Sequence, residues 1–540
     1  MSFSSLYVGA TGVVAHNASM QVVGNNLANV STTGYKKADT QFGSLMSQQL
    51  GTGGSIYETG AFAFSQIGKG VAVSEIRTIF TEGGLETTTT ATDLAIEGNG
   101  YFGVNNPYDG NTTNGAEYYT RAGAFRFNNE AYLVDPHGYR LQGYVVDRET
   151  GELATTISDV QLPYEDEIVD GNLVRTVQSE PRATTSFEMV TNLDHTAADL
   201  FGSYSTPFMA MLEAYNANLS NASTPFGDTL PEYSSSITCY DNEGNGHEVT
   251  VYFDPIADYT LSNATPGNSY WEYLIAIPAE SDGSAAYGTS GAGLVGAGVM
   301  VFDGQGQFVN QVAFSLDSTT ASSATSPGAW TTASFDEDGL PQFAVTFGSN
   351  GGAIGTEHFI SYDFGITSAT GTWTGGVSNA SGLGNNVQNL ASIGDPVRDA
   401  RVTTSYDNPS ATLYHIQDGY TSGYLQYVSV DREGFLNGHF TNNQTEQLFQ
   451  VAVYTFNSQW GLRRSGHTNF VATEASGAAI AGTASTNGRG TIAQNTLEES
   501  NVDMAEEFAK MIITQRGYQA NTKVITTSDS LLNTLISTKR

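Results

Sequence analysis

Three short motifs in the sequence have residue types that could bind a ligand. "GAGLVG" at Gly291–Gly296 has the glycine spacing of a dinucleotide-binding loop, "DNEGNG" at Asp241–Gly246 begins like a calcium loop, and "FDEDG" at Phe335–Gly339 gathers three carboxylates. The first motif requires a strand before it and a helix after it, but here a Gly/Ser-rich loop precedes it and no helical period follows. The twelfth position of a calcium loop is Glu, whereas here it is Tyr252. We therefore predict a loop, a hairpin turn and an acidic turn.

The other reactive residues form no recognisable catalytic set. The sequence contains no HExxH, GxSxG, P-loop or CxxC motif, and its eight His are scattered. His137 lies in "DPHG", which is typical of a turn. Cys239 is the single cysteine, which excludes an intramolecular disulfide and a multi-Cys metal site. We interpret it as a buried free thiol, with an intermolecular bond as the alternative. The prediction is a protein that is not an enzyme and has no catalytic, cofactor-binding or metal-binding residues.

The composition is that of a large, acidic and turn-rich protein. The chain has 540 residues, of which 60 are Gly and 14% are charged, against about 25% charged in ordinary globular proteins. The net charge of −34 disfavours nucleic acid and anionic membranes as partners, because both need a basic surface. No apolar stretch approaches the ~18–20 residues of a membrane span. The first residues also lack the basic start and apolar run of a cleaved signal peptide. We expect a cytoplasmic protein or one that is exported by another route.

Basic residues are distributed very unevenly along the chain. Ten Lys and Arg lie at or before Arg182 and eleven at or after Arg398, with none in the 215 residues from Ala183 to Val397. The same block contains 22 Asp and Glu, or about two thirds of the net charge. A composition peculiar to an acidic organism is one explanation. Because both edges of the block are abrupt, we favour a separate outer module that its own charge keeps from sticking.

Both ends of the chain carry narrow apolar stripes with a seven-residue period, which keeps one face of a helix turned toward a neighbouring helix. We predict helices at both ends, the second over about 502–538, that form a coiled-coil-like inner domain. Such helices are marginal alone in water, so we expect them to pack between copies of the chain and to order on assembly. Packing on the protein's own core is the alternative. The predicted inter-subunit packing residues are Leu6, Val13, Met20, Leu27, Met504, Phe508, Met511, Tyr518, Ile525 and Leu532.

Between the two ends the pattern is that of β-strands. Apolar and polar residues alternate there, and turn signals such as "EGNG" and "DPHG" separate the alternating stretches. The predicted fold class is mixed and mainly β, with β-rich middle and outer domains between N- and C-terminal α-helices. The clearest predicted strand regions are Thr92–Val104, Gly138–Asp147, His247–Phe253, Gln342–Phe347 and Leu448–Phe456.

The segment "NNLANVSTTGYKKA" at 25–38 resembles the N-terminal signature of the rod and hook proteins that form the axis of the bacterial flagellum. Within it, Asn25, Asn26, Asn29 and Gly34 are predicted to end the first helix and turn the chain outward. The resemblance covers about half of the chain, and the other segments that carry it are 70–104, 119–144, 417–456, 461–479 and 497–540. "ITCYDNEGNGHEVTVYF" at 237–253 also resembles an outer β-domain of the family.

The resemblance implies a structural subunit that needs no cofactor. Rod-type members are shorter and lack a large outer insert, so the length implies a hook-type subunit. Such a subunit self-assembles into a curved hollow tube, a flexible universal joint that transmits torque from motor and rod to filament. An extracellular location in the hook of the basal body, reached without a cleaved signal peptide, is also implied. The implied partners are other copies of the chain, the distal rod protein, the hook cap protein, the hook–filament junction protein and the flagellar type III export apparatus.

Composition and resemblance together divide the chain into segments. The predicted segments are an N-terminal helix of the inner domain at 1–30, an extended hook-type linker at 31–91, the first part of a β-rich middle domain at 92–182, acidic outer β-domains at 183–397, the return part of the middle domain at 398–490, and the C-terminal helix of the inner domain at 491–540.

Three other readings compete with a hook-type subunit. A distal-rod-type axial protein shares the terminal signatures. A secreted β-rich adhesin explains the acidic, turn-rich middle but not the paired terminal stripes. A carboxylate hydrolase on a β-scaffold explains neither, and it would require a well-formed pocket with convergent carboxylates.

Overall fold

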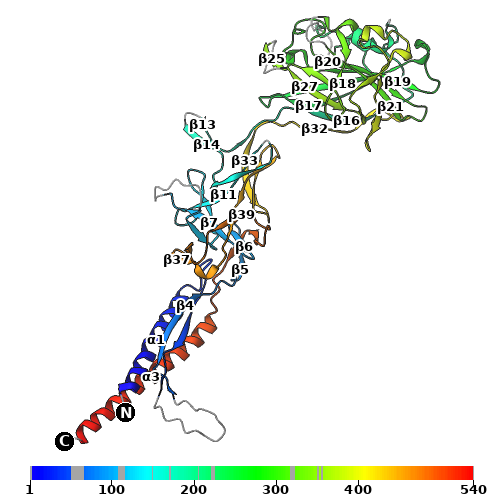
Figure 1. Cartoon of the computed structure of the whole chain (residues 1–540). Helices are drawn as coiled ribbons and strands as arrows, with labels where there is room; N and C mark the ends of the chain where they lie inside the picture. Colours follow the sequence, from blue (N-terminus) through cyan, green and yellow to red (C-terminus); the bar gives the residue numbers. More distant parts are fainter. Residues whose placement is uncertain are drawn as a thin grey trace, which may run out of the picture. The chain divides into compact units, whose positions relative to one another are not determined.

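The chain forms two compact units, the first made of Met1–Gln178 with Tyr424–Arg540 and the second of Ser179–Gly423. Strands dominate and helices occur mainly at the two ends of the chain (Figure 1), which confirms the predicted fold class. The second unit extends beyond the predicted acidic block at 183–397 on both sides. The computed structural model describes residues 3–49, 66–107, 116–148, 150–169, 172–204, 206–219, 225–316, 323–349, 352–353 and 357–538.

In the first unit, the two terminal helices lie side by side (Figure 1). Helix α1 is Phe3–Ala28 and helix α3 is Met504–Thr538. An antiparallel ribbon of β1 (Ala38–Ser44) and β4 (Val71–Thr78) contacts α1. The region predicted as an extended linker therefore contains a paired ribbon, because two segments of extended chain that meet satisfy each other's backbone groups.

The rest of the first unit is a β-domain in which the two halves of the chain pair. Strand β40 pairs with β6, and Ile492 lies opposite Ile96 in that register. The large sheet has the order β33-β34-β35-β11-β7-β8-β38-β37 over its main path. All three strand regions predicted for this unit form strands: 92–104 contains β6 and most of β7, 138–147 contains β11, and 448–456 contains β36 and part of β35. The strands are β6 (Leu94–Glu97), β7 (Tyr101–Asn105), β8 (Tyr118–Thr120), β11 (Arg140–Val146), β33 (Gly423–Val430), β34 (Phe435–Phe440), β35 (Thr445–Val451), β36 (Val453–Thr455), β37 (Arg463–Gly466), β38 (Asn469–Val471) and β40 (Thr491–Gln494).

The second unit is built from a six-stranded sheet, β17-β18-β19-β20-β21-β22, and a five-stranded sheet, β23-β24-β27-β16-β32. Successive residues of the central strands enter two different cores, so that Trp271 belongs to one and Leu274 to the other. Burial of both faces explains the nearly continuous apolar runs of these strands. The six strands are β17 (Tyr233–Tyr240), β18 (Gly246–Ile256), β19 (Ser269–Ala276), β20 (Leu294–Phe302), β21 (Phe308–Leu316) and β22 (Trp330–Thr332), and the five are β23 (Ser334–Phe335), β24 (Pro341–Val345), β27 (His358–Asp363), β16 (Ser186–Asn192) and β32 (Ala411–Gln417).

The motifs with possible chemistry are turns in the structure. "DNEGNG" connects β17 to β18, and the Asp241 carboxylate accepts the backbone N–H groups of Glu243 and Asn245, each at 2.9 Å. Asp336 caps the turn before β24 in the same way. The first half of "GAGLVG" is a turn and its second half begins β20, without a following helix. Cys239 is a fully buried free thiol in β17.

Candidate assembly surface at the helix pair

The two terminal helices pack through small residues. A Cβ atom added at Gly12 of α1 would lie 2.4 Å from Oδ1 of Asn521 on α3. At Gly9, an added Cβ would lie 3.0 Å from Cγ1 of Ile525. Side chains at these glycines would therefore force Asn521 and Ile525 of α3 out of their present positions. The absence of side chains lets the two helix backbones approach closely and makes a small-residue seam within a single chain.

The predicted packing residues are divided between this seam and its flanks. Ile525 packs on Gly9 in the seam. Met504, Phe508 and Tyr518 are exposed, with 54%, 50% and 36% of their surfaces accessible. The structure therefore does not bring the whole set together, and these three side chains lie outside the seam. The remaining six are half-buried: Leu6, Val13, Met20 and Leu27 on α1, and Met511 and Leu532 on α3.

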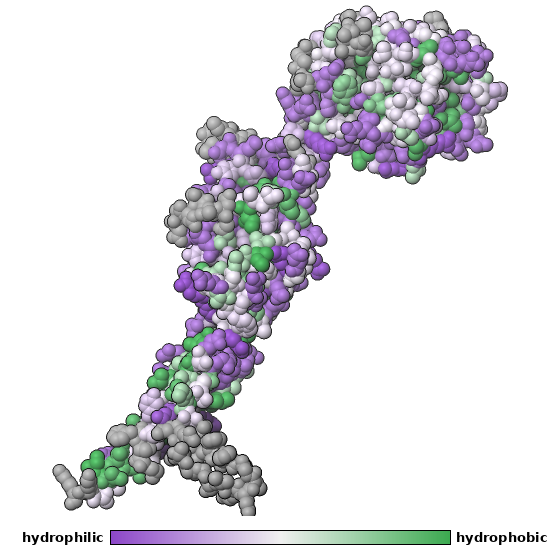
Figure 2. All heavy atoms as spheres, viewed as in Figure 1, coloured by the Kyte–Doolittle hydropathy of each residue, from purple (hydrophilic) through white to green (hydrophobic). Residues whose placement is uncertain are grey.

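Helix α3 carries many large apolar side chains that its own chain leaves uncovered. Some were part of the predicted stripe, whereas Ile513 at 69% and Leu531 at 58% exposure were missed. Their positions do not follow the seven-residue period, so only the structure reveals them. Figure 2 shows apolar side chains gathered over the helix pair. Exposed apolar surface of this extent marks an interaction site. The other exposed members on α3 are Ile512, Val524, Leu535 and Ile536.

The predicted turn residues lie where α1 ends. Asn26 is 1% exposed, and its side chain bonds both the N–H and the C=O of Ala38, at 3.0 and 2.8 Å. The Asn26 amide also donates to the Glu507 carboxylate of α3 at 3.0 Å. Asn25 donates to the Tyr35 hydroxyl at 3.1 Å. One side chain thus joins α1, the outgoing chain and α3.

Two further turn residues complete the change of direction. The Asn29 amide donates back to the carbonyl of Asn25 at 2.9 Å. Gly34 has φ +69°, and a Cβ there would lie 2.4 Å from the backbone nitrogen of Ala122. Its N–H donates to the carbonyl of Glu498 at 2.7 Å. Gly34 is therefore required both by its left-handed conformation and by the close approach of the β-domain.

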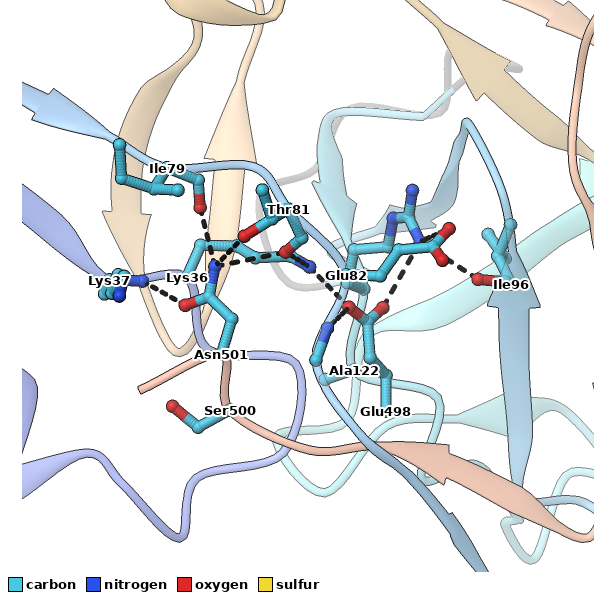
Figure 3. Close-up of polar contacts among 12 residues, drawn as sticks. Lys36, Lys37, Ile79, Thr81, Glu82, Ile96, Ala122, Glu498, Ser500 and Asn501 are labelled. Atoms are coloured by element: carbon cyan, nitrogen blue, oxygen red, sulfur yellow. Dashed lines mark hydrogen bonds and ion pairs between the residues drawn. The ribbon is translucent and has the colours of Figure 1, made fainter. Parts of the chain in front are cut away.

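A buried ion cluster lies at the base of the helix pair, where the Lys36 ammonium meets the Glu498 carboxylate (Figure 3). Lys36 is 2% exposed, Glu498 0% and Arg121 3%. The Glu498 carboxylate pairs with the Lys36 ammonium on one oxygen and with Arg121 at 3.3 Å on the other. Lys36 also donates to the carbonyl of Thr81 at 2.8 Å. The cluster therefore ties together the N-terminal turn, the β-domain and the strand that leads to α3.

Burial and ion pairing act in opposite directions on the charge of Lys36. Burial lowers the pKa of Lys36, and the facing Glu498 carboxylate opposes that effect. The neighbouring pair is different, because Lys37 bonds an exposed carboxylate, Glu506, at 2.8 Å. That hydrogen bond, with those from Lys510, lowers the pKa of Glu506 to about 2. A sequence signal for the buried pair existed only in the family signature, which contains Lys36.

Asn501 lies next to the ion cluster and bonds two other segments of the chain (Figure 3). Its side-chain oxygen accepts the backbone N–H of Lys37 at 2.6 Å, and its amide donates to the carbonyls of Ile79 and Thr81 at 2.8 and 3.1 Å. One asparagine thus satisfies backbone groups of two separate segments. Sequence reasoning missed this residue, because its partners are more than 400 positions away.

The described part of the chain offers little else in the way of chemistry. Among those residues, no group of three or more His, Cys, Asp or Glu is placed to hold a metal ion. None of the described helices combines the length and apolarity needed to cross a membrane. The surface of the helix pair is therefore the strongest candidate for a functional site.

Four family models match the chain in the order expected for a flagellar axial protein. They are "Flagella basal body rod protein" at 6–36, "Flagellar hook protein FlgE/F/G D1 domain" at 95–171, "Flagellar basal body protein FlaE D2 domain" at 212–420 and "Flagellar basal body rod FlgEFG protein C-terminal" at 493–538. The first and last models cover most of α1 and α3. Fold, helix pair and models together define a flagellar axial protein.

Comparison with individual proteins shows which members of the rod and hook family the chain is similar to. The flagellar hook protein FlgE of Treponema pallidum is 29% identical over 550 residues, and that of Borreliella burgdorferi is 29% identical over 541, each match covering 99% of both chains. The crystal structure of a Helicobacter pylori flagellar hook protein matches 76% of this chain and all of its own, at 14% identity and a TM-score of 0.43. The chain belongs to the flagellar rod and hook family, and its full-length relatives are hook proteins.

Proposed function

We propose that this chain is the structural subunit of a flagellar hook. Copies assemble into a curved hollow tube, a flexible universal joint that transmits torque from the motor and rod to the filament. The observation that carries the proposal is the set of large apolar side chains on α3 that a single chain leaves exposed. Other copies of the chain would cover them, and the gain in buried apolar surface, about 25 cal/mol per Å², would drive assembly.

In this assembly the helix pair forms the inner wall of the tube. We expected the apolar stripes of both terminal helices to be buried by other copies of the chain. That expectation needs correction, because α1 and α3 already pack on each other and α1 contacts β1 and β4. The apolar flanks, rather than the seam, are the surfaces that remain for neighbours. Met504, Phe508 and Tyr518 are the predicted packing residues that keep this role most directly.

The second unit has few charges that could fix it to the second unit of a neighbouring copy, so these units could slide past each other as the tube bends. Its described Arg–carboxylate pairs use arginines at its two edges, with Arg182 near Asp418 and Arg401 near Glu188. Between Ala183 and Val397 no Lys or Arg exists to lock one outer surface to another. Acidic surfaces without opposite charges repel weakly and are screened by salt, so contacts between outer units can shorten and lengthen as the tube bends.

The proposal extends to partners, location and chemistry. Its main partner is the chain itself, in a helical homopolymer, with the distal rod, hook cap and hook–filament junction proteins at the ends of the tube. The protein reaches the cell exterior through the flagellar type III apparatus without a cleaved signal peptide. It performs no catalysis and binds neither nucleic acid nor a membrane interior.

Electron microscopy of the purified chain at high salt tests this function. We expect curved hollow tubes from the full chain and none after deletion of 502–540, which removes α3. The deleted chain should keep its folded second unit, seen as an unchanged unfolding transition of the buried Trp271 and Trp330. Tubes from the deleted chain would refute the proposal.

A further inference from the structure

A cleft of about 510 Å³ opens beside the end of α1 in the first unit. This volume is within the ~300–1,000 Å³ of typical ligand sites. Its walls come from four separate segments: the end of α1 with the following turn, the stretch at 122–124, the loop at Asp135–His137, and the hairpin at 464–470. The cleft is distinct from the exposed apolar flanks of α3, and no residue of α3 lines it.

A buried acceptor without a donor lines this cleft. Asn469 is 3% exposed, and its side-chain oxygen is buried without a hydrogen-bond partner. Such an oxygen is destabilising until a donor binds it. The N–H of a peptide backbone is a donor of the required kind.

The surrounding side chains suit a polypeptide better than a small ion. The rings of His137 and His467 lie 4.0 Å apart between centroids, and Phe470 and Pro136 add apolar surface. Arg464 lines the same cleft but is already bonded to the carbonyl of Lys36. Aromatic surfaces beside an unpaired amide oxygen offer stacking and one specific hydrogen bond, which is the combination that holds an extended peptide.

The turn on one side of the cleft is held in an unusual conformation. Gly466, His467 and Thr468 all have positive φ, at 89°, 49° and 61°. Left-handed backbone is strongly disfavoured for a β-branched residue such as Thr468. Strain of this kind persists where the surrounding structure imposes it, and it clusters at binding sites.

We propose that this cleft receives an extended segment of a second copy of the chain. The inference rests on the proposed function, because only a polymer places a second copy there. Asn25 and Asn29 form part of its wall, so the cleft opens at the end of α1, and Tyr7 and Val14 are exposed further back along the same helix. A copy that packs along the helix pair would thus run past the opening.

Photochemical crosslinking tests this assignment in assembled tubes. The His467→Cys variant is labelled with a benzophenone maleimide, and native Cys239 does not compete, because it is fully buried and burial raises its pKa to about 12. Illumination of tubes should give crosslinked dimers that monomers do not give, with a single segment of the second copy attached at position 467. Adding Asn469→Ala should lower the dimer yield about fivefold, through loss of the amide contact.

Two controls separate the possible failures. Glu152→Cys, exposed in the same unit but outside the cleft, measures the crosslinking of any exposed position in a tube. His137→Cys repeats the test from the neighbouring loop. If the label at one position blocks docking, the other position still gives a result. Tubes in which both cleft positions give no more dimer than Glu152→Cys overturn the inference and leave the proposed function intact. Absence of tubes from the unmodified chain contradicts the proposed function itself.

Discussion

Glu498 is the residue on which the base of the helix pair depends most. It is fully buried and pairs with both Lys36 and Arg121. Removal of one partner from a buried ion cluster leaves an uncompensated charge, which costs about 3–5 kcal/mol. We expect Glu498→Gln to lower the free energy of unfolding of the first unit by this order, as measured by urea denaturation of the monomer.

The matched control is Glu506→Gln, a few residues further along. Glu506 bonds Lys37 and Lys510 but is nearly half exposed. Exposed pairs contribute about 0–1 kcal/mol, so this variant should unfold almost as the unmodified chain does. Equal losses in the two variants would show that burial does not set the strength of the Glu498 cluster.

Gly34 provides a second test at the scale of single residues. Gly34 and Gly151 have the same φ, +69° and +70°, but only Gly34 has a neighbouring backbone within reach of a Cβ. Gly151→Ala should therefore cost only the conformational strain, about 1–2 kcal/mol. Gly34→Ala should cost clearly more and raise the protein concentration needed for assembly. Similar melting temperatures for both variants would contradict the role assigned to the close approach to Ala122.

The second unit should be more stable at mildly acidic pH. Burial raises the pKa of Asp254 to about 7 and that of Asp363 to about 6, from 3.8. The folded state therefore keeps protons that the unfolded chain has lost, so stability is greatest below about pH 4 for these groups and falls as the pH rises to about 7.

Tryptophan fluorescence measures this effect, because three of the four Trp, Trp271, Trp330 and Trp373, lie in the second unit. We expect a higher melting temperature at pH 5.5 than at pH 8, by about 2–4 °C per kcal/mol for a unit of this size. Asp254→Asn should reduce the difference. A higher melting temperature at pH 8 would show that these carboxyl groups are not destabilised by burial.

Residue roles were only partly predictable from the sequence. The turn at Asn25–Gly34 followed from residues that favour helix ends and left-handed backbone. The ion cluster and Asn501 did not, because their partners come from segments hundreds of positions apart. No local pattern distinguishes a buried Lys36 from an exposed Lys37.

At the scale of elements, the structure separates residues that join α1 to α3 from residues left for other copies. Phe508 and Ile512 are about half exposed on α3, whereas Ile525 packs on Gly9. We expect Phe508→Ser with Ile512→Ser to abolish tubes while the unfolding free energy of the monomer changes by less than about 1 kcal/mol. Sedimentation after salt-induced assembly, beside monomer denaturation, measures both effects.

The control for that prediction is Ile525→Ala. It should lower monomer stability by about 1 kcal/mol or more, because it removes packing within the helix pair. If the double variant still assembles, or if it destabilises the monomer more than Ile525→Ala does, the apolar flank is not an assembly surface.

Elements were predicted best where one local rule decides them. Among the described residues, five turns share the spacing Asp-x-x-Gly, with the Asp carboxylate bonded to the N–H groups two and four residues later and the Gly at positive φ. Those at Asp135, Asp241 and Asp336 were predicted, whereas those at Asp303 and Asp431 were not. Such turns can be predicted from the sequence because the Asp that accepts the hydrogen bonds and the Gly at positive φ lie within five residues. The seam of the helix pair could not be predicted from the sequence, because a seven-residue stripe does not show which of its side chains face the other terminal helix. These turns begin at Asp135, Asp241, Asp303, Asp336 and Asp431.

At the scale of the whole molecule, the acidic second unit should set how easily a tube bends. Lys–Glu pairs placed on facing outer surfaces would add attractions that must break when neighbouring units slide. We expect tubes from such variants to be straighter or stiffer, by electron microscopy at low salt, and swimming to be impaired. Unchanged curvature and swimming would count against this role.

We expect assembly to depend most on neighbouring copies that cover the apolar flanks of the helix pair. A helical reconstruction by electron cryomicroscopy of tubes grown from the full chain tests it directly. We expect the helix pairs to line the inside of the tube, with Phe508 and Ile512 packed against other copies. Tubes in which these side chains face open solvent, or in which α1 and α3 make no contact with other copies, would contradict the account.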